Sequence, residues 1–242
     1  MSLVRVGAVL STVAASALVL SAAPASAAAA PVLDSPGAQD VAVGVRAVKS
    51  YVVEVHATGA SSVTARSERT AAGSCDSFAD DALTKADGGW WGAVYDLGPR
   101  DFVGHGDNGC AGRWKVTFTA KDAAGTKRTA TTYHSMRRQA RFVRLNASLE
   151  PVRKGAKVTV TGKLERASWA DQKYHGYAGR TAELQFRTPE GEYSTVREVV
   201  GSRTGTYSVT ATQSQKGCWR LVFRGSATTT ATKATGDCVG VR

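Results

Sequence analysis

Apolar and polar residues alternate with a period of two along much of this chain. In residues 51–57 every second position from Tyr51 is apolar, while Glu54 and His56 lie between them. Side chains of a β-strand point alternately to its two faces, so this pattern predicts a half-buried strand. The same alternation predicts strands at 114–120, 158–164, 182–187, 207–211 and 219–224. Four further segments have a composition that favours strands, namely 60–66, 90–97, 126–136 and 193–200.

Turn-forming residues separate these strands at short intervals. Gly98-Pro99, the segment 122–125 and the segment 188–191 are examples. The strands are short, turns recur about every ten residues, and no helical period is present, which predicts an all-β chain of two antiparallel sandwiches in tandem. We expect a flexible leader at 28–40, a first domain at 41–138 and a second at 139–242.

Several motifs of the second half resemble a known class of domain. They are the stretch 158–164, Trp169, the stretch 177–187, Gly205-Thr206-Tyr207 and Cys218-Trp219-Arg220. Together they resemble the immunoglobulin-like modules of secreted actinobacterial proteins. The first half, with Trp114 to Phe118 before the turn at 122–125, looks like a more distant bacterial immunoglobulin-like domain. The resemblance implies a fold and secretion, and it carries over no catalytic residue.

The first 27 residues have the features of a secretory signal peptide. Arg5 precedes an apolar run that ends near Leu20, and Ala25-Ser26-Ala27 forms a small-residue cleavage site. The run is too short for a typical membrane span. We therefore expect a secreted, extracellular protein with no membrane-spanning segment, in a compartment where disulfides form.

The four cysteines fall two in each half of the chain. They allow three pairings, of which Cys75–Cys110 with Cys218–Cys238 is the simplest, because each bond then closes one domain. No C-x-x-C motif is present, so we expect disulfides rather than a metal site.

The formal net charge is +11 at pH 7, and the excess is uneven. Four arginines fall within residues 137–144. Basic charge outside the cell favours weak attraction to anionic surfaces such as a cell-wall polymer, and the alternative is that the charge serves solubility alone. No nucleic-acid recognition motif is present, so nucleic acid is not an expected partner.

The segment 166–177 places aromatic and basic residues in one loop between strands. Such a loop suits a glycan or an anionic polymer, and the alternative is that Trp169 and Tyr177 fold back to cap the end of their sandwich. Together with the arginine run, this segment supplies the candidate ligand-binding residues Trp169, Tyr174, His175, Tyr177, Arg137, Arg138, Arg141 and Arg144.

The chain offers few residues for catalysis. It lacks H-E-x-x-H, G-x-S-x-G, P-loop and dinucleotide motifs, so we predict no catalytic residue, no cofactor and no enzymatic activity. Acidic loops near Asp80 and Asp107 could meet through the first disulfide, but no EF-hand spacing exists and we predict no metal site. His105, between two glycines, is expected in a solvated turn.

These observations favour a secreted binding or adhesion protein. Its partner would be an anionic cell-wall polymer, a glycan or a secreted protein, and the sequence does not predict its oligomeric state. The alternatives are a secreted inhibitor that presents a loop to an extracellular enzyme, and an undetected hydrolase.

Overall fold

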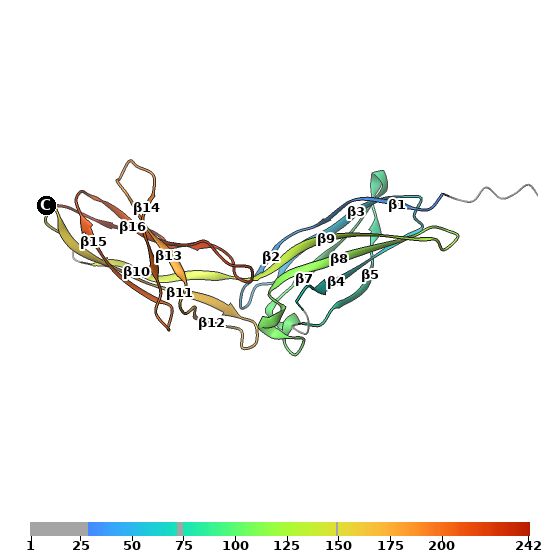
Figure 1. Ribbon diagram of the computed structural model, residues 1–242, viewed down its shortest axis with the longest axis horizontal. Coiled ribbons are helices and arrows are strands. Elements are labelled where there is room, and N and C mark those ends of the chain that lie inside the picture. The colour runs from blue at the N-terminus through green and yellow to red at the C-terminus, as the bar shows by residue number, and fades with distance from the viewer. Residues whose placement is uncertain (1–28, 72–74, 149) are drawn as a thin grey trace, which may run out of the picture.

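Two β-sandwiches follow one another along the chain and meet end to end, the first running from blue to green in Figure 1 and the second from yellow to red. The structure is a computed structural model that describes residues 29–71, 75–148 and 150–242. Within these residues the chain has no α-helix and only short 3-10 turns, η1 (Asp87–Gly89), η2 (Pro99–Phe102) and η3 (Asp107–Cys110). The all-β, two-sandwich prediction is confirmed. The expected signal peptide lies outside the described residues.

Two sheets form the first sandwich. One has the order β1-β3-β7-β6 and the other β2-β9-β8-β4-β5. Their strands are β1 (Val32–Ala38), β2 (Val41–Val43), β3 (Lys49–Thr58), β4 (Ser62–Arg69), β5 (Phe78–Ala82), β6 (Thr84–Lys85), β7 (Trp90–Leu97), β8 (Gly112–Lys121) and β9 (Lys127–Arg138). All described pairs are antiparallel except β2 with β9, which run parallel.

The second sandwich also has two sheets. In one, β11 pairs with β10, β12 and β15; the other has the order β14-β13-β16-β17, with β18 also on β16. The strands are β10 (Ala140–Ser148), β11 (Ala156–Ser168), β12 (Lys173–Gly176), β13 (Thr181–Arg187), β14 (Ser194–Val200), β15 (Thr206–Gln213), β16 (Gly217–Phe223), β17 (Thr232–Lys233) and β18 (Asp237–Val239).

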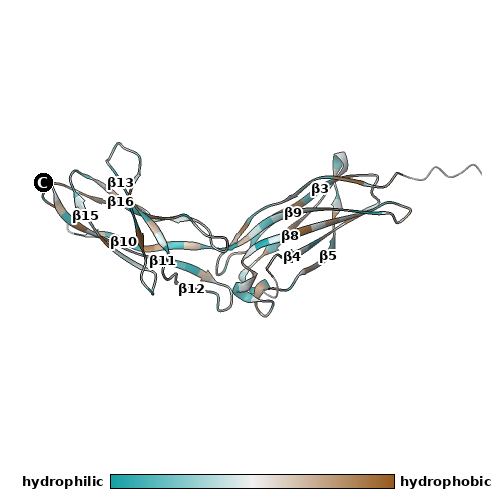
Figure 2. Cartoon of the chain, viewed as in Figure 1, coloured by the Kyte–Doolittle hydropathy of each residue, from teal (hydrophilic) through white to brown (hydrophobic). Residues whose placement is uncertain are grey.

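The alternation in the sequence becomes the two faces of each sheet, and Figure 2 shows hydrophobic and hydrophilic residues interleaved along the strands. In β8, Trp114, Val116 and Phe118 are fully buried between the sheets of the first sandwich. In β16, Trp219 and Leu221 occupy the equivalent inner face of the second. Each sandwich therefore has its own apolar core.

Both predicted disulfides form, and each lies within one sandwich. Cys75–Cys110 ties the loop after β4 to η3, and Cys218–Cys238 joins residues directly opposite one another on β16 and β18. No free cysteine is present. The predicted pairing is confirmed.

The leader prediction is wrong for residues 32–38. They form β1, which pairs antiparallel with β3 and has a register shift between Asp34 and Gly37. Pro36 lies in this irregular part, where its missing N–H does not interrupt the ladder. Leu33 and Ala38 pack against the first core, so the edge strand forms from backbone pairing and local contacts despite a turn-like composition. Likewise, the acidic segment near Asp80, which the sequence predicts as a loop, contains the short edge strands β5 and β6.

Replacing Trp219 with alanine should destabilise the second sandwich by about 3–5 kcal/mol, the usual range for a buried tryptophan. Its side chain is 3% exposed, and its Nε1–H donates to Oε1 of the fully buried Gln213 at 2.6 Å. The substitution therefore leaves a cavity and an unpaired amide oxygen. Urea unfolding measures the loss, and a change below about 1 kcal/mol would contradict the core assignment.

The buried His134 should make the first sandwich less stable in mild acid. Its Nδ1 lies 3.0 Å from the Gln39 carbonyl oxygen, while Nε2 is buried without a hydrogen-bond partner among the described residues. Burial lowers the pKa of His134 below its ordinary 6.5, although the Gln39 carbonyl opposes the shift. The unfolded chain thus binds the proton more readily, so the contribution of His134 to stability is present above about pH 6.5 and is lost as the pH falls below it.

Urea unfolding between about pH 7.5 and about pH 5.5 tests this effect, because one proton gives a slope of at most about 1.4 kcal/mol per pH unit. His134→Gln should flatten the pH dependence of the unfolding free energy relative to the wild type. His175→Gln, which changes an exposed histidine, should keep the His134 contribution. The same slope in wild type and His134→Gln would sink the assignment.

Candidate binding site at the domain junction

A single residue connects the two sandwiches. β9 ends at Arg138 and β10 begins at Ala140, so only Gln139 lies between the strands. The Gln139 N–H donates to the Val43 carbonyl of the first domain, and its own carbonyl accepts from the Ala167 N–H of the second. The linker is therefore hydrogen-bonded to both domains and has little freedom to swing.

Trp169, the residue directly after β11, is buried in the core of the other domain. It is fully buried and belongs to the apolar cluster of the first sandwich. Its ring stacks on Phe102 of η2, with the ring centroids 4.1 Å apart and the planes at 17°. Its Nε1–H donates to the Val43 carbonyl at 3.1 Å. The side chain thus anchors the β11–β12 hairpin of the second domain in the first.

Polar contacts fix the same hairpin. The Asn108 side chain accepts from the Trp169 backbone N–H at 2.8 Å and donates to the Ser168 hydroxyl at 3.2 Å. Nε of Arg138 donates to the Ala167 carbonyl at 2.6 Å. Because apolar and polar contacts act on neighbouring residues, the junction combines packing with directional bonds.

The aromatic candidates are not a free stacking platform. Trp169 caps the neighbouring sandwich rather than its own, and Tyr177 is 5% exposed within the second core. The Tyr174 hydroxyl donates to the Gln139 side chain at 2.8 Å, and its ring lies under the Arg141 guanidinium at 3.9 Å. His175 is exposed and pairs with Asp171 at 2.6 Å. Burial removes Trp169 from the residues that a ligand can reach.

The arginine run does not form one positive surface. Arg137 pairs with Asp40 at 3.2 Å, and Arg141 pairs with Glu165 at 2.8 Å. Burial raises the pKa of Glu165, but hydrogen bonds from Arg141 and Lys163 outweigh it and hold that pKa below the usual value. Arg138 is 8% exposed, and Arg144 is exposed. Carboxylates distant in sequence thus compensate half of the run.

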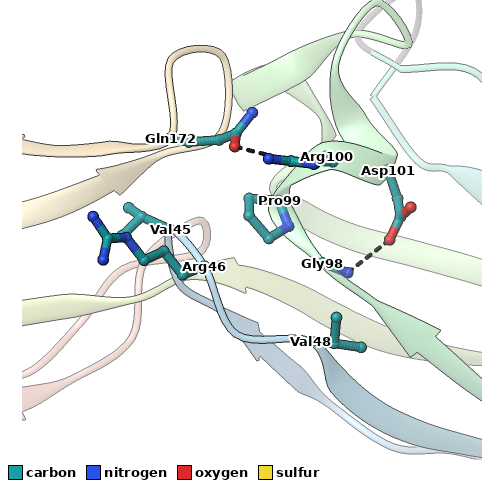
Figure 3. A pocket seen from close by; sticks show the side chains of 8 residues that line it. All are labelled: Val45, Arg46, Val48, Gly98, Pro99, Arg100, Asp101 and Gln172. Carbon is teal, nitrogen blue, oxygen red and sulfur yellow. Dashed lines mark hydrogen bonds between the residues drawn. The ribbon is translucent and has the colours of Figure 1, made fainter.

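A groove of about 630 Å³ opens beside this junction (Figure 3), within the size range of typical ligand sites. It is lined by the β2–β3 loop and the start of η2 from the first domain and by the hairpin of the second. The residues are Val45, Arg46, Val48, Gly98, Pro99, Arg100, Asp101 and Gln172. Valine and proline side chains supply an apolar part beside two guanidinium groups.

The charged residues of the groove differ in their contacts. Nε of Arg100 donates to the Gln172 side chain at 3.3 Å, which bridges the two domains. The Asp101 carboxylate accepts from the Gly98 N–H at 2.7 Å. Arg46 is exposed, and neither arginine of the groove has an ion pair within the described residues. No local sequence pattern indicates this site, because its residues come from three distant segments.

The acidic loops show only pairwise contacts. Asp76 pairs with His105 at 3.0 Å, and Asp107 accepts from the Gly104 N–H. Among residues 29–71, 75–148 and 150–242, no group of three His, Cys, Asp or Glu side chains is placed to hold a metal ion. The Asp80 side chain is outside what the structure describes. No helix in the described part has the length and hydropathy to cross a bilayer.

Comparison with known proteins gives distant structural similarity. No protein-family model and no curated protein matches the chain. A chimeric titin Z1Z2 tandem aligns with 88% of this chain and 99% of its own, at 14% identity and a TM-score of 0.29. A tetra-tandem repeat from the extending region of a large adhesion protein aligns with 85% of this chain and 49% of its own, at 11% identity and a TM-score of 0.28. The D00-D0 domain of intimin aligns over 86% and 98%, at 12% identity and a TM-score of 0.30. Scores this low say nothing of what this chain binds.

Trp169→Ala should destabilise the first sandwich by about 3–5 kcal/mol, although residue 169 follows strand β11 of the second. The substitution empties a site in the first core and removes the bond to Val43. Urea unfolding followed by NMR signals of each domain locates the loss. Trp90→Ala, at a side chain 37% exposed, is the matched control and should cost far less. Equal losses in the two variants would contradict the anchoring role.

Proposed function

We propose that this protein is an extracellular, non-enzymatic binding protein that holds two immunoglobulin-like domains in a fixed relation and binds an anionic polymer of the cell surface at their junction. The observation that carries the proposal is the junction groove with Arg46 and Arg100, neither of which is paired with a carboxylate in the part of the chain that the structure describes. The two disulfides are compatible with an extracellular location.

The fixed junction favours firm binding in the groove. A groove between two domains holds its ligand firmly only when the domains keep their relative position, since ordering them on binding would cost entropy. The Trp169 anchor and the hydrogen bonds of Gln139 already fix the two domains when the protein folds, so binding does not have to order them. Apolar contacts from Val45 and Pro99 would accompany the charge attraction.

The test is cosedimentation of the purified protein with cell-wall preparations at low and at high salt. Binding should fall steeply as salt rises, because exposed charges are screened over about 8–10 Å at physiological ionic strength. The double variant Arg46→Gln/Arg100→Gln should weaken binding strongly. Arg137→Gln and Arg141→Gln should weaken it little, because carboxylates already pair with these arginines.

The charge-matched control is Lys127→Gln/Arg128→Gln, two exposed residues at the start of β9, at the end remote from the junction. It removes the same charge and should bind walls like the wild type. A wild type that stays in the supernatant at low salt would refute the proposed function. An equal loss of wall binding in the control would mean that net charge alone causes the attraction, and the assignment of the groove as the binding site would be wrong.

A further inference from the structure

Two guanidinium groups lie against the Tyr177 ring on the second-domain side of the junction, and the charge of a third, that of Arg138, interacts with the same group. The guanidinium carbons of Arg166 and Arg180 are 4.0 and 4.4 Å from the centre of the Tyr177 ring. The Tyr177 hydroxyl accepts from the Thr229 hydroxyl at 3.4 Å. The backbone of Arg138 forms a parallel β-bridge with Thr229, and the charges of Arg166 and Tyr177 act on the Arg138 guanidinium.

None of these arginines has a carboxylate partner within the described residues. Among the described residues, the Arg138 side chain donates one hydrogen bond, from Nε to the Ala167 carbonyl, and its terminal amino groups are not buried without a partner, so they can meet an acceptor from solvent. Asp171 acts on Arg138 only at longer range, and its carboxylate is bonded to His175. In contrast, Arg224 of the same domain lies 2.6 Å from Glu183.

Burial makes this lack of compensation costly. Arg138 is 8% exposed, so its charge is only partly solvated and gains from an anionic partner. Burial and then Arg166 lower the pKa of Arg138 to about 10, so the group is still charged at neutral pH. Burial lowers the pKa of Arg166 as well, and Arg180 adds to that effect while Tyr177 opposes it.

The tyrosine experiences the same positive potential. Burial alone would raise the pKa of Tyr177. Hydrogen bonds with Thr229 and Ser226, together with the charges of Arg166 and Arg180, outweigh burial and lower that pKa. Stacking on the ring explains how two guanidinium groups are held, but a neutral ring does not neutralise them.

We propose that Arg138, Arg166 and Arg180 form a binding site for a phosphate-type oxyanion, in particular a phosphodiester group of an anionic polymer. Guanidinium groups present paired donors that match two oxygens of a phosphate, and a bound dianion or diester would compensate the buried charge. The site deepens the proposed function, on which its biological role rests, by naming the chemical group recognised at the junction.

Titration of the full chain with inorganic phosphate, followed by two-dimensional NMR, tests the site directly. Signals of the Arg138 and Arg166 side chains and of the Tyr177 ring should shift and saturate, and acetate at matched ionic strength should give a clearly weaker response. Arg166→Gln and Arg180→Gln should each lower the affinity for phosphate about tenfold or more, since charge-assisted hydrogen bonds are strong.

Arg153→Gln/Arg203→Gln is the matched control, because both residues are exposed in the same domain. This control should keep the wild-type affinity. Absence of saturable shifts in the wild type, an equal response to acetate, or equal loss in the control would overturn the site.

Cosedimentation with walls separates this site from the proposed function. A wild type that binds walls but not phosphate refutes the oxyanion site and leaves the proposed function standing. A wild type that binds phosphate through Arg166 and Arg180 but leaves walls in suspension refutes the proposed function and keeps the site.

Discussion

Insertion of Trp169 into the neighbouring core is the interaction on which the rest of the molecule depends. Contacts between domains of one chain are usually polar and permit motion, so two sandwiches in tandem move relative to one another by default. Here a fully buried ring from the second domain completes the core of the first. Separation of the domains would expose that ring to water and leave a cavity beside Phe102, which opposes hinge motion.

The candidate surfaces follow from this anchor. Gln172 reaches Arg100 because the hairpin that bears it is held by Trp169 and Asn108. Arg138 is buried because its backbone continues into the junction and its side chain bonds Ala167 of the same hairpin. The arginines that lie close together at residues 137–144 therefore do not form one positive surface in the folded protein. Arg137 and Arg141 are paired, while Arg46, Arg100 and the two arginines stacked on Tyr177 have no ion pair among the described residues.

Local pattern was enough to predict the fold class, the longer strands and the disulfide pairing. Trp114 and Trp219 alternate with polar neighbours, so their burial follows from strand geometry alone. Trp169 is different, since its apolar character requires burial but does not say in which core. Edge strand β1 escaped prediction because its stability comes from pairing with β3 rather than from its own pattern. The groove and the pair of arginines stacked on Tyr177 could not be predicted, because each joins segments that only the tertiary fold brings together.

Residual dipolar couplings of the wild-type protein in a weakly aligned medium test the central claim most directly. If Trp169 and Gln139 lock the junction, the couplings of both sandwiches must fit one alignment tensor with the relative orientation of this structure. Two tensors of different magnitude would mean that the domains reorient independently, and the account of a fixed junction would then be wrong.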